Sequence, residues 1–398
     1  MDNRHSGARL SRREVKRYHK RDFLKMCCLG AGGWLLGGTN VRDVLETAAA
    51  PTSFPAADQE PGRWSKEALF FTPVTGGVKC LKCPHGCVLR PGGAGICRNR
   101  VNYQGKGYTI AYGNPCAVHI DPIEKKPLFH FLPSTRAFSI AAAGCNLRCL
   151  NCQNWQISQV SPLETENDDL MPERVVEEAR RTGCDSIAYT YSEPITFYEY
   201  AFDTATLARR AGVRNVWKSN GYINEKPLRQ LCTVIDAANI DLKSFDDKVY
   251  QELNSASLAP VLRTLKIFHE EGVWLEITNL VIPTWTDDLD TIRRMTEWLC
   301  TNGLRDCPLH LSRFTPLYKL NQLPATPVAT LEKARAIAMT AGMRYVYIGN
   351  VPGHNSESTY CPRCGRTVVE RRGFSILKVS IVEGKCAGCG ENIAGVWK

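Results

Sequence analysis

Between about residues 136 and 350, short β-branched or apolar runs alternate with helical stretches that are closed by glycine. The short runs predict seven strands, at residues 138–143, 186–191, 214–219, 239–243, 275–282, 309–314 and 345–349. The stretches between them predict helices, among them residues 173–181, 195–211, 258–271 and 289–302. This alternation is typical of β-α-β units around a parallel sheet. Six or seven such units can curl into a full or partial barrel, whose functional site lies at the carboxyl ends of the strands.

The composition is that of a soluble globular protein, neither disordered nor embedded in a membrane. Of the 398 residues, 43% are hydrophobic and 23% are charged, and the net charge is +10. The first 25 residues contain nine Lys or Arg and three Asp or Glu, a local charge of +6, which leaves +4 for the other 373. Because the basic excess is local, we expect no general nucleic-acid-binding surface.

Residues 1–50 resemble an export signal. An apolar or small-residue run at 26–38 is too short to span a bilayer comfortably but has the length of a signal-peptide core. Lys20-Arg21 precedes it, as in a twin-arginine signal with Lys at the first position, and Ala48-Ala49-Ala50 is a candidate cleavage site. We expect export to the cell envelope; the alternative is a disordered basic tail on a cytoplasmic protein. Residues 51–69 are expected to form a linker.

Cysteine is the compositional outlier, with 18 residues. Four Cys-x-x-Cys pairs occur where chance predicts roughly one. This spacing allows both sulfurs to face one metal centre and is not favoured in disulfide frameworks. Eleven cysteines fall into three groups, and we interpret the other seven as ordinary small apolar residues.

The central group is Cys145, Cys149 and Cys152, directly after the first predicted strand. Three thiolates on one short loop can bind three irons of a [4Fe–4S] cluster and leave the fourth iron without a protein ligand. An open metal position indicates chemistry rather than structure. The alternative is a structural metal loop that takes its fourth ligand from elsewhere.

The two flanking groups each contain four cysteines. Cys361, Cys364, Cys386 and Cys389 form two Cys-x-x-Cys-Gly turns, which predict a zinc ribbon, with iron or a reducible pair as alternatives. The less regular group predicts either zinc or an auxiliary iron–sulfur cluster, and consists of Cys80, Cys83, Cys87 and Cys97.

Taken together, these motifs resemble the radical S-adenosylmethionine (SAM) superfamily. More closely, the chain is similar to the AmmeMemoRadiSam-type proteins, relatives of pyruvate formate-lyase activating enzyme. The resemblance covers about residues 70–398, and the matching runs are residues 80–87, 121–127, 144–155, 189–194, 219–221, 241–243, 349–350 and 360–364.

The resemblance implies an α/β fold with a partial (β/α)6-type TIM barrel, the radical SAM core, at residues 136–355. An N-terminal metal-binding region with four cysteines, at 70–135, would precede this core, and a zinc ribbon at 356–398 would follow it. The implied cofactors are a [4Fe–4S] cluster, SAM and zinc. The implied partners are a flavodoxin- or ferredoxin-type electron donor and Memo-like and AMMECR-like proteins.

The resemblance also implies where SAM binds. Ser192 and Glu193 would hold its amino group, while the ends of the next two strands would contact the carboxylate and ribose through Asn220, Gly221, Asp241 and Lys243. Relatives often carry an aromatic residue beside the adenine at the position of Asn151, so we expect Trp155 to take over the stacking; the alternative is weaker stacking of the adenine. Apart from the resemblance, we expect the polar residues at the strand ends to face the pocket, with a satisfied structural role as the alternative for each; they are Glu276, Asn279, His310, Arg313 and Asn350.

Lys218 departs from the pattern of glycyl-radical activating relatives. Those proteins typically have Asp at this position, where it helps the acid equivalent to Asp241 to bind a monovalent cation. We expect Lys218 to replace that cation and reach Asp241 and the SAM carboxylate; the alternative is a solvent-facing lysine.

The resemblance implies a radical SAM enzyme. A reduced cluster would cleave SAM and form a 5′-deoxyadenosyl radical that abstracts hydrogen from a substrate the sequence does not define. A glycyl-radical-activating-type reaction is one form of this chemistry. The alternative function is a non-catalytic iron–sulfur and zinc protein for electron transfer or scaffolding.

Overall fold

A computed structural model describes residues 62–398 of the chain. The predicted signal region at 1–50 and most of the predicted linker lie outside these residues. Residues 62–398 belong to one compact unit. Within this part of the chain, no helix is both long enough and apolar enough to cross a membrane.

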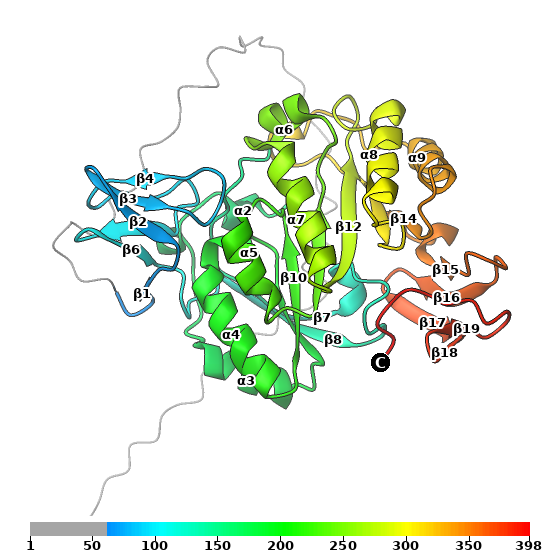
Figure 1. Cartoon of the computed structure of the whole chain (residues 1–398), viewed down its shortest axis with the longest axis horizontal. Helices are drawn as coiled ribbons and strands as arrows, with labels where there is room; N and C mark the ends of the chain where they lie inside the picture. Colours follow the sequence, from blue (N-terminus) through cyan, green and yellow to red (C-terminus); the bar gives the residue numbers. More distant parts are fainter. Residues whose placement is uncertain (1–61) are drawn as a thin grey trace, which may run out of the picture. The chain divides into compact units, whose positions relative to one another are not determined.

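The main sheet has eight strands in the order β14-β13-β12-β11-β10-β9-β8-β7 (Figure 1). Their bounds are β7 Ala117–Pro122, β8 Arg136–Ala141, β9 Ser186–Tyr189, β10 Arg214–Ser219, β11 Ala237–Asp241, β12 Trp274–Val281, β13 Leu309–Arg313 and β14 Val346–Gly349. Strands β8 to β14 are parallel to their neighbours, and β7 is antiparallel to β8. The seven predicted strands are confirmed to within two residues at each end, whereas β7 was not predicted.

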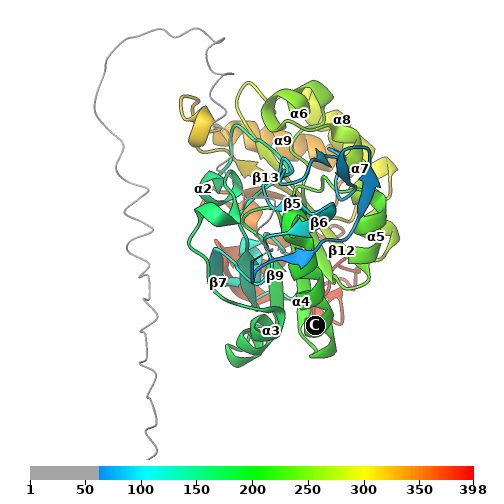
Figure 2. The ribbon, with the colours of Figure 1, turned by 90° about the vertical axis from the view of Figure 1, so that its left-hand side faces the viewer.

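Helices connect the parallel strands, as the alternating pattern predicted. Their bounds are α2 Trp155–Ser158, α3 Pro172–Arg181, α4 Tyr198–Arg210, α5 Glu225–Cys232, α6 Asp247–Asn254, α7 Leu258–Glu270, α8 Leu289–Thr301 and α9 Val328–Thr340. In both views α4, α5 and α7 lie on the outer side of the sheet (Figures 1 and 2). The predicted helix at 195–211 begins as the 3-10 turn Pro194–Phe197 and becomes α-helical at Tyr198.

The core lies between the sheet and these helices. Ile187 of β9, Trp217 of β10, Ile240 of β11 and Leu265 of α7 belong to one buried cluster. Parallel strands are covered on both faces, so their sequences are nearly continuous apolar runs. This property made the strands visible in the sequence and leaves their carboxyl ends as the place where polar side chains can gather.

Small antiparallel sheets form both flanking regions. The N-terminal pair comprises β1 Lys66–Glu67, β6 Lys106–Thr109 and β5 Arg100–Tyr103 in one sheet, and β2 Phe71–Val74, β3 Gly77–Cys80 and β4 Val88–Leu89 in the other. The C-terminal pair comprises β15 Thr359–Tyr360, β16 Thr367–Arg372 and β17 Ser375–Val379, and β18 Ile381–Val382 with β19 Lys385–Cys386. Residues 130–132 link the C-terminal region to the main fold, because Val396 N donates to His130 O and Leu132 N donates to Val396 O, both at 2.7 Å.

Candidate metal centre

The loop that carries Cys145, Cys149 and Cys152 begins four residues after β8 ends, at the carboxyl edge of the parallel sheet. Backbone hydrogen bonds hold it at several points: Gly144 N donates to Ile157 O at 2.8 Å, and Leu150 N donates to Leu253 O at 2.9 Å. The three thiols are therefore presented by an ordered backbone. A short loop fixed at both ends is suited to a metal cluster bound through three cysteines.

Two of the three sulfurs accept hydrogen bonds from amide groups. Leu147 N donates to Cys145 Sγ at 3.3 Å, and Asn254 Nδ2 donates to Cys149 Sγ at 3.2 Å. Hydrogen bonds to cysteine sulfur stabilise its anionic, metal-bound form and tune the potential of an iron–sulfur cluster. The loop thus fits a [4Fe–4S] cluster in its chemistry as well as its spacing. Asn254, the last residue of α6, was not predicted, since only the packing of α6 on the loop brings it to Cys149.

Gly144 allows the cluster loop to approach the N-terminal region closely. Its φ is +102°, and a Cβ atom there would lie 2.1 Å from Asn99 Oδ1 and 2.6 Å from Cys97 O. Any larger residue at this position would therefore separate the two segments.

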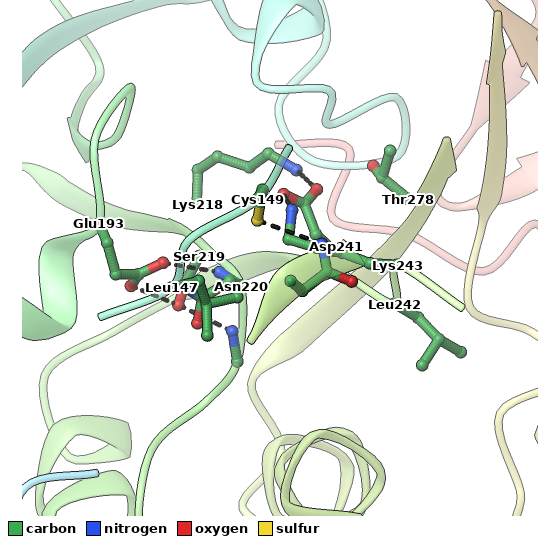
Figure 3. Close-up of polar contacts among 12 residues, drawn as sticks. Leu147, Cys149, Glu193, Lys218, Ser219, Asn220, Asp241, Leu242, Lys243 and Thr278 are labelled. Atoms are coloured by element: carbon green, nitrogen blue, oxygen red, sulfur yellow. Dashed lines mark hydrogen bonds and ion pairs between the residues drawn. The ribbon is translucent and has the colours of Figure 1, made fainter. Parts of the chain in front are cut away.

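Glu193 connects the ends of β9 and β10. Its Oε1 accepts from Ser219 Oγ at 2.7 Å and Ile195 N at 3.1 Å, and its Oε2 accepts from Asn220 N at 2.8 Å (Figure 3). Burial raises the pKa of Glu193 to about 7, although the hydrogen bonds from Asn220 and Ser219 act in the opposite direction. Its carboxylate caps the 3-10 turn that follows, and its role toward the SAM amino group stays a prediction.

Asn220 links the third strand end to the cluster loop. Its Nδ2 donates to Asn146 Oδ1 at 2.8 Å and lies 3.8 Å from Cys145 Sγ. Gly221 follows with a φ of +69°, and a Cβ there would lie 2.8 Å from Ile240 Cγ2. Ser192 is used locally, because its hydroxyl donates to Ala142 O at 2.5 Å. The structure therefore brings these predicted residues to one edge of the sheet.

Lys218 and Lys243 both pair with Asp241 (Figure 3). Lys243 Nζ lies 3.0 Å from Asp241 Oδ2, and Lys218 Nζ also donates to Asn239 Oδ1 at 2.6 Å. Burial alone would raise the pKa of Asp241, but the two ammonium groups outweigh it and hold this pKa at about 2. Lys218 therefore reaches Asp241, as expected, instead of pointing at solvent, while its contact with SAM stays a prediction.

Trp155 lies next to an aromatic residue that was not predicted. Its ring stacks on Tyr318, with centroids 5.3 Å apart and planes 15° from parallel. Tyr318 is almost 170 residues from Cys152 in the sequence, so only the fold could reveal this pairing. Tyr318 therefore covers one face of the Trp155 ring, and the adenine contact of Trp155 stays a prediction.

Glu276 and His310 have the structural role that was the alternative to facing a substrate pocket. Glu276 accepts from His130 N at 2.7 Å, Phe129 N at 2.9 Å and His310 Nε2 at 2.7 Å, and both side chains are fully buried. Their polar atoms hold residues 129–130 against the sheet. Buried polar groups need partners, and a protein segment supplies them here.

The other three polar residues of that expectation are also used by the protein. Asn279 is buried and its Nδ2 donates to Leu242 O at 2.8 Å. Arg313 Nε donates to Thr326 O at 2.8 Å, and Asn350 Nδ2 donates to Arg313 O at 3.1 Å. Strand-end polarity in the sequence therefore overestimated how many of these groups are free for a substrate.

A buried lysine beside the sheet was not singled out as a site residue. Lys126 Nζ donates to Asp121 Oδ2 and Ser139 Oγ, both at 2.5 Å, and Tyr191 donates to the same Asp121 carboxylate. Burial lowers the pKa of Lys126 to about 8, against the opposing effect of Asp121. The sequence indicated residues 121–127 only as one of the runs that resemble the family.

The C-terminal cysteines converge as a single-ion site requires. The sulfurs of Cys361, Cys364, Cys386 and Cys389 all lie within 4.8 Å of one another, with Cys361–Cys389 at 3.6 Å and Cys364–Cys386 at 3.8 Å. Zinc binds four thiolates tetrahedrally at about 2.3 Å, which places the sulfurs about 3.8 Å apart. The site is compatible with zinc.

Comparisons with known proteins agree with this geometry. The Radical SAM superfamily profile matches residues 139–296. An uncharacterised protein of Methanocaldococcus jannaschii is 45% identical over 331 residues, which cover 82% of this chain and 98% of that protein. Pyruvate formate-lyase 1-activating enzyme of Escherichia coli K12 is 27% identical over 220 residues, 51% of this chain and 89% of the relative.

The chain also matches solved structures in part. A domain of pyruvate-formate lyase-activating enzyme from Bacteroides vulgatus has a TM-score of 0.37 and 17% identity, and the match covers 42% of this chain and 99% of that domain.

Proposed function

From the premise that this chain belongs to the radical SAM superfamily, we propose that it is an enzyme that cleaves SAM reductively and abstracts hydrogen from a substrate. When bound, a [4Fe–4S] cluster supplies the single electron that breaks the sulfonium bond, which gives methionine and a 5′-deoxyadenosyl radical. The observation that carries the proposal is the three-cysteine loop at the first strand end, with polar residues of the next three strand ends beside it.

The residues of this chain have distinct tasks in the proposal. Cys145, Cys149 and Cys152 would hold three irons, and the amide of Asn254 would stabilise the thiolate of Cys149. Asn220 donates to Asn146 and lies beside Cys145, so it would hold this part of the cluster loop in place.

The paired charges would then orient SAM itself. Lys218 and Lys243 place two ammonium groups around one carboxylate, which leaves a local excess of positive charge. That excess suits the carboxylate of SAM, since an anion beside paired ammonium groups lowers the net charge of the site.

The test is anaerobic reconstitution of the full chain with iron and sulfide, followed by SAM and a strong reductant. We expect 5′-deoxyadenosine and methionine to form even without substrate. Cys149→Ala should reduce both products to background, and Cys307→Ala, at a buried cysteine outside the three groups, should leave them unchanged. A cluster whose spectrum ignores SAM, with no product, would favour the electron-transfer or scaffold alternative.

A finer proposal concerns the substrate and partners. The similarity to pyruvate formate-lyase activating enzymes supports hydrogen abstraction from a glycine of a partner protein, with a flavodoxin- or ferredoxin-type protein as electron donor. Incubation of the reconstituted chain with candidate partners, Memo-like and AMMECR-like proteins included, should give a protein-based radical in electron paramagnetic resonance spectra. Deoxyadenosine formation without such a radical would set aside this substrate class but not SAM cleavage.

A further inference from the structure

The N-terminal cysteines line one small, partly open cavity. Cys80 ends β3, Cys83 and Cys87 lie on the following loop, and Cys97 precedes β5. All four line the cavity, together with Arg100 and Asn146 among others. The fold therefore brings these four cysteines to one place. The sequence alone allowed either zinc or an iron–sulfur cluster there.

The spacing of the sulfurs separates the two possibilities. Within residues 62–398, the C-terminal ribbon is the one place where three or more potential ligand atoms of His, Cys, Asp or Glu lie within 4.8 Å of one another. The N-terminal sulfurs are thus more widely spread than the ribbon sulfurs, as are those of the central loop at 145–152. A single zinc ion requires sulfurs about 3.8 Å apart. A cluster in which each thiolate binds its own iron keeps them farther apart.

Basic side chains buried beside the cavity favour an anion inside it. Arg100 donates to both oxygens of Glu199 at 2.7 Å, and Lys82 Nζ lies 3.2 Å from the same carboxylate. All three side chains are 2% exposed, so the guanidinium of Arg100 and the amine of Lys82 share one carboxylate in a nearly dry environment. An uncompensated buried charge is strongly unfavourable.

Arg100 also has hydrogen-bond donors that lack an acceptor. Its Nε and Nη1 are buried and have no hydrogen-bond partner in the part of the chain that the structure describes. Buried guanidinium N–H groups without acceptors are rare in native proteins and point to a missing ligand. Because Arg100 lines the cavity among the four cysteines, the acceptors that it lacks would be sulfur atoms of an anionic cluster.

We propose that Cys80, Cys83, Cys87 and Cys97 bind a second iron–sulfur cluster of the [4Fe–4S] class, held against the guanidinium group of Arg100. This assigns iron, rather than zinc, to the N-terminal region, and it goes beyond the proposed reaction, on which it does not depend.

The second cluster lies beside the central cysteine loop. Asn146 of that loop lines the cavity, and its carbonyl oxygen is 2.7 Å from His85 Nε2. Arg148 of the same loop donates to Ile96 O, and Asn99 Nδ2 donates to Ala143 O at 2.5 Å. The N-terminal metal region is therefore packed directly on the SAM-cleaving site rather than on a remote surface.

The test counts metals in a variant that cannot hold the central cluster. The full chain carrying Cys145→Ala, Cys149→Ala and Cys152→Ala is reconstituted anaerobically with Fe²⁺, sulfide and Zn²⁺, and its iron, sulfide and zinc are measured. We expect about four irons and one zinc per chain, against about eight irons and one zinc in the wild type. Adding Cys307→Ala to the triple variant should change neither value.

Two zinc ions and no iron in the triple variant would overturn the proposal. Since this variant lacks the central cluster, its metal content is independent of whether the wild type cleaves SAM. Absence of SAM cleavage in the wild type and absence of iron in the triple variant can therefore be told apart.

A second measurement addresses Arg100. In the triple variant, Arg100→Met should make the reduction potential of the remaining cluster more negative, because a buried positive charge favours the more negatively charged reduced form. Arg100→Lys should restore most of the wild-type potential, and the exposed Arg90→Met should have no effect. An unchanged potential in Arg100→Met would contradict the placement of the cluster against Arg100.

Discussion

Two acidic residues, Glu193 after β9 and Asp241 at the end of β11, have pKa values shifted in opposite directions. Burial raises the pKa of Glu193 to about 7, whereas Lys218 and Lys243 overcome burial and hold that of Asp241 at about 2. Glu193 receives hydrogen bonds from neutral donors, and Asp241 receives them from ammonium groups. Neutral donors compensate less of the desolvation of a carboxylate than cations do. The two residues are therefore suited to different tasks.

The setting of Glu193 predicts a pH dependence of stability. In the folded chain its carboxyl group keeps a proton up to about pH 7, whereas its ordinary pKa is 4.5. The folded state thus binds more protons between these values, and Glu193 lowers stability progressively as the pH rises from 4.5 to 7. Relative to Glu193→Gln, the wild type should lose at most about 3 kcal/mol over this range.

Thermal unfolding of cluster-free protein across the range from weakly acidic to weakly basic pH measures this difference. The melting temperatures of wild type and Glu193→Gln should diverge as the pH rises, with the wild type falling relative to the variant. Parallel curves would show that Glu193 is not protonated in the folded chain near neutral pH.

The contact between Lys218 and Asp241 predicts how SAM cleavage responds to salt. Because an ammonium group already neutralises Asp241, wild-type SAM cleavage should be nearly indifferent to potassium or sodium. Lys218→Asp should create a site for such a cation and make cleavage depend on it. Steady-state formation of 5′-deoxyadenosine with and without each ion provides the measurement.

The exposed Lys248→Asp is the matched control and should behave like the wild type. Strong activation of the wild-type protein by potassium or sodium would show that Lys218 does not replace a cation.

Among the elements, the C-terminal ribbon builds its small core partly from cysteines that could bind a metal. Cys361 and Cys386 pack with Phe129, Tyr345 and Val368 in one buried cluster. The ribbon strands are only two to six residues long, so they bury little apolar surface of their own. We therefore expect zinc, when bound, to contribute directly to the folding free energy of this small element.

Cys361→Ala should accordingly remove one zinc per chain. Three remaining thiolates bind zinc less well, and the small buried cluster loses a fixed point, so the melting temperature should fall by several degrees. The iron of the central cluster should be retained, because that loop is built from other elements. Cys300→Ala, a partly exposed cysteine of α8, serves as the control in metal analysis and thermal unfolding.

An unchanged zinc content together with an unchanged melting temperature in Cys361→Ala would refute a structural zinc at this site.

At the scale of the whole molecule, three cysteine groups occupy three separately built sites. The central loop follows β8, the N-terminal group lies on small sheets that pack on it, and the C-terminal group lies in the ribbon. A protein that acquires metal clusters before it crosses a membrane has to be exported in the folded state. We therefore propose that residues 1–50 direct twin-arginine-type export.

A fusion of residues 1–50 to a folded reporter tests this proposal. The reporter should leave the cytoplasm in a host with a working twin-arginine system, and Lys20-Arg21→Gln-Gln should stop it, because the basic pair is the feature that resembles the signal. Arg12-Arg13→Gln-Gln tests whether the upstream pair acts instead. Cytoplasmic retention of the unaltered fusion would favour the disordered-tail alternative.

The sequence by itself determined the parallel sheet and the chemistry of its edge. Buried parallel strands must be nearly continuous apolar runs, so the seven strands could be predicted from local pattern. Cysteine spacing is also local, which is why Cys145, Cys149 and Cys152 could be assigned before the fold was known. The antiparallel β7 was missed because its half-exposed sequence, Ala117–Pro122, has no such run.

Only the tertiary structure decided which polar groups have partners within the protein and how the sulfurs of each cysteine group are spaced. The pairing of Glu276 with residues 129–130, the stack of Trp155 on Tyr318 and the approach of Asn254 to Cys149 all join segments more than 100 residues apart. Distances between sulfurs and the unpaired donors of Arg100 likewise exist only after packing. Spacing along a chain specifies which ligands can act together, whereas the free energy of burying charge and the distance between ligands are properties of the folded chain.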